Sequence, residues 1–127
     1  INAESARYKE LKEDKFFIPD DFPNTWKQKL FDFNTEGNRL YHLCLEDLES
    51  TLGRKRAKES ARFFKTYSSQ IQADITFNMR SFANFLKLRS SEHAQKEIRE
   101  IALTMLELVS SIEGEPFKYT LEAFNKH

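Results

Sequence analysis

The sequence has 127 residues, and its 20 Lys plus Arg are balanced by 20 Asp plus Glu, so the formal net charge is zero. This length suits one compact domain with a core, and the zero charge provides no global basic field for nucleic acid or an anionic membrane. Because no apolar run approaches the roughly 20 residues of a membrane span either, neither a nucleic-acid partner nor a membrane is expected.

The cysteine count and the first residue indicate where the protein is found and whether the sequence is a complete polypeptide. The single cysteine, Cys44, excludes an internal disulfide, and no signal-peptide segment is present. We therefore expect a cytoplasmic protein. The first residue is Ile1 rather than methionine, so we expect a segment of a longer polypeptide.

The motifs of several enzyme classes are missing. No GxGxxG, P-loop, HExxH or CxxC motif appears, and no Ser-His-Asp set or carboxylate pair is evident. A self-contained hydrolase or a metal-dependent enzyme is therefore not expected, and we assign no metal site.

The first half of the chain contains two expected helices. Residues 16–18 are a short strand candidate, ended by Pro19. Trp26–Leu52 has leucines at helical spacing and is expected to form a helix that stops at Gly53. His42 falls off its apolar arc and is expected to be exposed.

A second, basic helix is expected over Arg54–Lys65, and its cationic face is of the kind that is ordinarily solvated. A nucleic-acid binder that uses its basic residues stays an alternative, disfavoured by the zero net charge and marked by steep salt dependence. Ile71–Phe77 then alternates between apolar and polar residues, as a strand with one buried face does.

The pattern changes at Asn78, which can cap a helix over Met79–Leu88. One side of this helix carries Arg80 and Asn84, and the other carries phenylalanines. In a continued helix Arg89 would point to the apolar side, where an unpaired charge is unfavourable. The helix therefore ends near Leu88, or Arg89 faces a cavity that holds a polar partner.

Arg80, Asn84 and Arg89 together suggest a pocket for a planar anion, because guanidinium groups bind such ligands through paired donors. On spacing alone, a solvated polar face with a surface arginine is the simpler interpretation. Ser90 and Ser91 are then expected to cap a long helix over Glu92–Ile112, and Pro116 to start a final short helix. The elements predict a helix-rich α+β fold, with residues 1–127 as a single domain.

The stretch FNMRSFANFLKLRSSEHAQKEIR closely resembles the C-terminal core of flavin-dependent thymidylate synthases. That family typically has Asn-x-Arg-Ser at the end of a strand, then Asn-Phe, Leu-Arg and an Ala-Gln-x-Glu-Ile run. The corresponding residues here are Asn78, Arg80, Ser81, Asn84, Phe85, Leu88, Arg89, Ala94, Gln95, Glu97 and Ile98. Asn2, Ser5, Arg7 and Tyr8 match the tail of the family's signature motif, whose Arg-His-Arg half would precede Ile1.

The resemblance implies the C-terminal part of an α/β flavin-dependent thymidylate synthase fold. It also implies reductive methylation of dUMP to dTMP, with methylenetetrahydrofolate as the carbon source and NADPH as the electron donor through FAD. Members are homotetramers with sites built between subunits. The implied dUMP-binding residues are Ser5, Arg7, Arg62, Leu88 and Arg89, with Arg89 as the catalytic residue; the implied FAD-binding residues are Asn78, Arg80 and Asn84.

The sequence departs from the family pattern in two places. Ala3 stands where members often carry an acid, and Lys65-Thr66 replaces a common Leu-Pro, so the loop after Arg62 is expected to differ. Because the Arg-His-Arg part is missing, the alternative is a non-catalytic helical half-domain that acts as an interaction or assembly module. Bound yellow flavin would distinguish the enzyme from this module.

Overall fold

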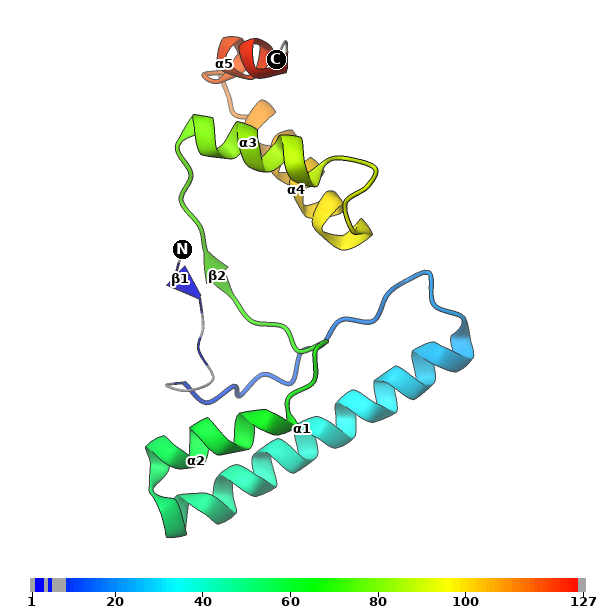
Figure 1. The fold of residues 1–127 in the computed structure, drawn as a ribbon, viewed down its shortest axis with the longest axis vertical. Helices are drawn as coiled ribbons and strands as arrows, with labels where there is room; N and C mark the ends of the chain where they lie inside the picture. Colours follow the sequence, from blue (N-terminus) through cyan, green and yellow to red (C-terminus); the bar gives the residue numbers. More distant parts are fainter. Residues whose placement is uncertain (1, 4, 6–8, 126–127) are drawn as a thin grey trace. The chain divides into compact units, whose positions relative to one another are not determined.

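The computed structural model describes residues 2–3, 5 and 9–125, a helix-rich chain with one small antiparallel sheet (Figure 1). The chain divides into two compact units, Ile1–Ile75 (unit 1) and Thr76–His127 (unit 2). The expected α+β class is confirmed.

Unit 1 is built on a pair of helices, α1 (Asn24–Leu52) and α2 (Arg54–Ala61), which pack side by side (Figure 1). The chain turns between them at Gly53, whose φ of +79° is in the left-handed region that glycine favours. The predicted first helix and its stop are thus confirmed. The second predicted helix ends as an α-helix at Ala61, and the 3-10 helix η1 (Arg62–Phe64) follows it.

The buried side of α1 changes character along its length. Its buried residues recur at helical spacing and are Asn34, Asn38, Tyr41 and Leu45. The first two are amides and the last two are apolar, so the stripe is polar toward the start of α1 and apolar toward its end. Leu11, Ala57 and Ala61 complete the core on the apolar half.

The N-terminal segment of unit 1 runs antiparallel to the segment after η1. Strand β1 (Asn2–Ala3) pairs with β2 (Ala73–Asp74), with Asn2 opposite Asp74. Nearer the helices, the Phe17 amide donates to the Ser68 carbonyl at 2.9 Å and the Gln70 amide donates to the Lys15 carbonyl at 3.0 Å. The strand candidate at residues 16–18 is reduced to one bridge between Phe16 and Ser69.

The strand predicted within Ile71–Phe77 is present but comprises only Ala73–Asp74. Its predicted buried face is not formed in the described chain, since the Ile71 and Ile75 side chains are 52% and 48% exposed. An alternating pattern gives a buried strand only where another layer covers one face, and β1 supplies just two paired residues.

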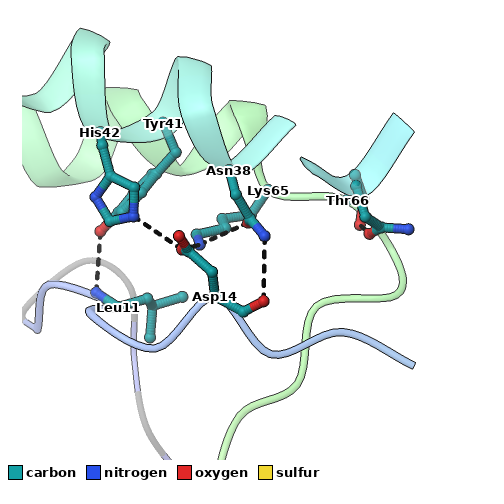
Figure 2. A network of polar contacts seen from close by, with 8 residues as sticks. Leu11, Asp14, Asn38, Tyr41, His42, Lys65 and Thr66 are labelled. Carbon is teal, nitrogen blue, oxygen red and sulfur yellow. Dashed lines mark hydrogen bonds and ion pairs between the residues drawn. The ribbon is translucent and has the colours of Figure 1, made fainter. Parts of the chain in front are cut away.

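A polar network joins the N-terminal segment to α1 and to the loop after η1 (Figure 2). We call it the Lys65 network; its members are Asp14, Asn38, Tyr41, His42 and Lys65. The Lys65 Nζ donates to Asn38 Oδ1 at 2.8 Å and to Asp14 Oδ1 at 3.1 Å, and lies 4.4 Å from the centre of the Tyr41 ring. His42 Nε2 lies 2.8 Å from the same Asp14 oxygen. The nearly buried ammonium of Lys65 is therefore well paired.

Neighbouring hydrogen bonds reinforce this connection. The Tyr41 hydroxyl accepts from the Leu11 amide at 3.0 Å, and Asn38 Nδ2 donates to the Asp14 carbonyl at 3.3 Å. The Thr66 hydroxyl donates to the Asn34 side-chain oxygen. Both residues of the Lys65-Thr66 pair therefore bind α1.

Acidification below about pH 4 is expected to weaken unit 1. Burial acts to raise the pKa of Asp14, but hydrogen bonds from His42 and Lys65 outweigh it and leave this pKa below its ordinary 3.8. Because the folded pKa is lower than the unfolded one, the stabilisation is present at neutral pH. It is lost as the pH falls from about 4 through the folded pKa.

Thermal melts of the parent and of Asp14→Asn at pH 7 and pH 3 would measure this contribution. We expect Asp14→Asn to melt lower at pH 7 and the difference to shrink at pH 3. The effect should be modest, because the Asp14 side chain is 44% exposed and solvent screens it. An equal difference at both pH values would show that the Asp14 charge does not contribute.

Unit 2 contains the helices α3 (Met79–Arg89), α4 (Lys96–Ser110) and α5 (Lys118–Asn125). The predicted cap of α3 is confirmed, since the Ser81 amide donates to Asn78 Oδ1 at 2.8 Å. Phe82, on the predicted apolar side, is buried. The predicted break between two separate helices is also confirmed.

The prediction that Ser90 and Ser91 cap the next helix is wrong, because α4 begins at Lys96 rather than near Glu92. The Ser90 hydroxyl instead donates back to the Leu86 carbonyl at 2.6 Å, and the Ser91 hydroxyl accepts from the His93 amide at 3.3 Å. These local side-chain bonds close a turn in place of a first helical turn. Within the described residues, no helix is both long and apolar enough to cross a membrane.

Candidate functional site

Four of the candidate ligand-binding residues line one pocket on α3, namely Arg80, Asn84, Leu88 and Arg89. The first three follow one another at steps of one helical turn, so their side chains lie on one face. Arg89 is the last residue of α3 and its side chain is exposed rather than buried. The helix therefore extends one residue beyond its predicted end and includes Arg89, which lines the pocket.

The pocket also has an aromatic wall. Phe77, Phe85 and Ser81 complete its lining. The ring centre of Phe77 lies 5.4 Å from that of Phe85 and 5.9 Å from that of the buried Phe82. These ring contacts hold the residue before the Asn78 cap against α3, and with it the start of the helix.

The pocket has a positive charge available for a ligand. Its lining includes two guanidinium groups and no carboxylate. Neither Arg80 nor Arg89 forms an ion pair with another residue of the described chain. Two free planar cations beside an aromatic ring and a carboxamide suit a planar, anionic heteroaromatic ligand.

Asn78 occupies a different position from the other flavin-binding candidates. Its side-chain oxygen caps α3 by accepting from the Ser81 amide, and it is not among the residues that line the pocket. The Asn78 side chain could still offer a ligand its nitrogen and the second lone pair of its oxygen.

The remaining candidates belong to unit 1, whereas the pocket belongs to unit 2. Ser5 is half-buried, and its carbonyl accepts from the Lys9 amide at 2.9 Å. Arg62 opens η1, is exposed, and its guanidinium carbon lies 5.9 Å from the centre of the Phe63 ring. Arg7 lies outside the described residues.

Sequence reasoning assigned Phe85 only to the apolar side of α3 and gave Phe77 no place in a pocket. Phe85 follows Asn84 directly, so it lies about 100° around the helix from it, at the border between the two faces. The position of Phe85 directly after Asn84 was therefore the sequence feature that could have indicated its place in the pocket. Among the residues that the structure describes, no group of three or more His, Cys, Asp or Glu side chains is placed to hold a metal ion.

Comparison with known proteins identifies the family. A family model described as thymidylate synthase complementing protein matches residues 1–113. The chain belongs to the flavin-dependent thymidylate synthase family.

Two curated relatives carry the family name. The chain is 35% identical over 138 residues to the flavin-dependent thymidylate synthase of Thermosipho africanus. This alignment covers 99% of the chain and 58% of the relative. It is 32% identical over 133 residues to that of Helicobacter pylori, which covers 100% of the chain and 62% of the relative. The chain thus spans about three fifths of the length of these flavin-dependent thymidylate synthases.

Proposed function

We propose that the chain is the C-terminal part of a flavin-dependent thymidylate synthase. This enzyme converts dUMP to dTMP by reductive methylation, with methylenetetrahydrofolate as carbon donor and NADPH as electron donor through FAD. The observation that carries the proposal is the pocket on α3, where two guanidinium groups, neither ion-paired within the part of the chain that the structure describes, lie beside an aromatic wall and the Asn84 carboxamide. This set of groups fits the planar, anionic surfaces of a nucleotide and a flavin.

Each pocket residue has a role that its chemistry supports. Arg89 binds the uracil edge of dUMP and stabilises the negative charge that develops as the ring is activated. A guanidinium group suits both roles, because it is planar and permanently charged. Leu88 offers its backbone to the same base. Arg80 and Asn84 hold FAD, and Asn78 joins them through its side-chain nitrogen. The flavin and the folate supply the redox and one-carbon chemistry when bound.

The family resemblance also assigns dUMP-binding residues to unit 1. Ser5, Arg7 and Arg62 bind the phosphate of dUMP, where a hydroxyl and two guanidinium groups form charge-assisted hydrogen bonds. The protein would act as a cytoplasmic homotetramer. Large exposed apolar side chains in both units support such an assembly, among them Phe33 at 65%, Phe63 at 81%, Leu108 at 63% and Tyr119 at 82% exposure.

The full-length protein that contains this chain provides the test. It should purify yellow, with a flavin absorption spectrum, and should form dTMP from dUMP when methylenetetrahydrofolate and NADPH are supplied. A colourless protein that forms no dTMP after incubation with FAD would contradict the proposal and favour a non-catalytic assembly module.

Arg80→Ala is expected to weaken flavin binding. Loss of a charge-assisted contact costs about 1.5–3 kcal/mol, which corresponds to roughly a tenfold to hundredfold weaker affinity. Flavin occupancy by absorbance, followed by FAD titration of the stripped protein, would measure it.

Lys87→Ala is the matched control, because Lys87 is an exposed cation of the same helix that does not line the pocket. It should retain the parent's flavin occupancy. If Arg80→Ala also retained it, Arg80 would not belong to the flavin site.

A further inference from the structure

The Lys65 network connects two segments that carry proposed phosphate ligands. Asp14 lies on the N-terminal segment that follows Ser5, and Lys65 closes the turn that starts at Arg62, since its amide donates to the Arg62 carbonyl at 3.0 Å. We propose that Lys65 is a positioning residue of the nucleotide site, which fixes the segment after Ser5 against the turn that carries Arg62. This inference rests on the function proposed above.

The N-terminal segment is bound both to α1 and, by backbone hydrogen bonds, to residues 68–70. Residues 9–15 form no helix or strand, so ordering them has a conformational entropy cost that contacts elsewhere must offset. The attachments to α1 run from the Leu11 amide to Tyr41, from the Asp14 carbonyl to Asn38 and from the Asp14 carboxylate to His42. The ammonium of Lys65 contacts Asp14, Asn38 and Tyr41, so it lies at the centre of all three.

The burial of Lys65 distinguishes it from the other charged residues of the network. Its side chain is 8% exposed, whereas those of Asp14 and His42 are 44% and 37% exposed. Two of its donors reach Asp14 and Asn38, and the charge faces the Tyr41 ring. The ammonium is therefore engaged within the protein, which assigns Lys65 to positioning rather than to contact with a ligand.

The matching groups on α1 show why an apolar residue would not replace Lys65. Asn38 is 7% exposed and Asn34 is 1% exposed, and they pair with Lys65 and Thr66 respectively. Removal of the lysine would leave the buried Asn38 side-chain oxygen without its donor, which is unfavourable, and would take from the Asp14 carboxylate one of its two partners, the other being His42. The Lys65-Thr66 pair and the two buried asparagines thus form one matched set.

The test compares Lys65→Met with Arg39→Met in the full-length enzyme. Methionine keeps the length of the side chain without its charge. Arg39 is a suitable control, because its ion pair with Glu36, at 2.6 Å, is exposed and lies within α1. The measurements are the KM for dUMP, kcat, flavin occupancy, and amide hydrogen exchange over residues 9–17.

We expect Lys65→Met to raise the KM for dUMP by about fivefold or more, with kcat and flavin occupancy near those of the parent. Amide exchange over residues 9–17 should become faster in this variant, and Arg39→Met should match the parent in every measurement. Asp14→Asn removes the charge from the partner and should change the KM in the same direction by less. This second variant keeps the test available if Lys65→Met does not fold.

Two results would overturn the inference. One is an unchanged KM for dUMP in a folded Lys65→Met enzyme. The other is an equal loss of kcat, flavin binding and dUMP affinity, which would indicate general destabilisation. A parent protein that forms no dTMP would contradict the proposed function instead, and unchanged exchange over residues 9–17 in Lys65→Met would then still refute the fixing role of Lys65.

Discussion

Arg89→Lys, in the full-length enzyme, is expected to fold normally and to lose most of its dUMP-dependent turnover. Lysine keeps the positive charge at the end of α3 but lacks the two parallel donors that grip a pyrimidine edge. Removal of a donor aimed at developing negative charge typically lowers kcat by about 10²–10³. The measurement is single-turnover dTMP formation at saturating dUMP, alongside a thermal melt.

A second comparison separates this role from a general effect of charge chemistry on α3. Lys87→Arg replaces a lysine by an arginine on the same helix. Because Lys87 does not line the pocket, this variant should have the parent's turnover. If Arg89 acts mainly in the transition state, kcat should also fall more than flavin affinity. Near-parent product formation with an unchanged melt would identify Arg89 as an ordinary surface residue.

Tyr41→Ala is expected to destabilise unit 1 severely. Tyr41 is fully buried on α1, and truncation of a large buried aromatic residue costs about 3–5 kcal/mol. The change also leaves the Leu11 amide without its acceptor and removes the ring beneath the Lys65 ammonium. Against a usual domain stability of roughly 5–15 kcal/mol, this is a large share.

Denaturant unfolding of three variants would divide this loss into its parts. Tyr41→Phe keeps the ring but leaves the buried Leu11 amide without its acceptor, so it should cost about 1–3 kcal/mol. Tyr119→Ala removes a tyrosine that is 82% exposed and should stay within about 0.5 kcal/mol of the parent. A Tyr41→Ala protein as stable as Tyr119→Ala would mean that the core of unit 1 lies elsewhere.

The helices could be predicted from the sequence because their patterns are local. Leucine spacing and Gly53 located α1, and the change of period at Asn78 located α3. The limits of β2 and α4 depend on other contacts. β2 needs a partner strand that the alternation around Ile75 cannot reveal, and α4 starts late because the Ser91 hydroxyl bonds within a turn.

The candidate pocket was partly predictable for the same reason. Arg80, Asn84 and Arg89 lie within ten residues of one another, so helical spacing and the family resemblance both indicated them. The Lys65 network could not be predicted from the sequence, because Asp14 and Lys65 are 51 residues apart and neither belongs to a periodic pattern that indicates the other. Only the three-dimensional structure reveals such a pair.

The mixed character of the buried stripe on α1 has a consequence for how uniquely this helix is aligned. A purely apolar side chain such as Leu45 would tolerate several longitudinal alignments, but Asn34, Asn38 and the Tyr41 hydroxyl each match one donor. A slide of one turn in either direction would bring Leu30 to Thr66 or His42 to Lys65. The hydrogen-bonding groups of the stripe therefore favour a single register of α1, which its apolar side chains alone would not fix.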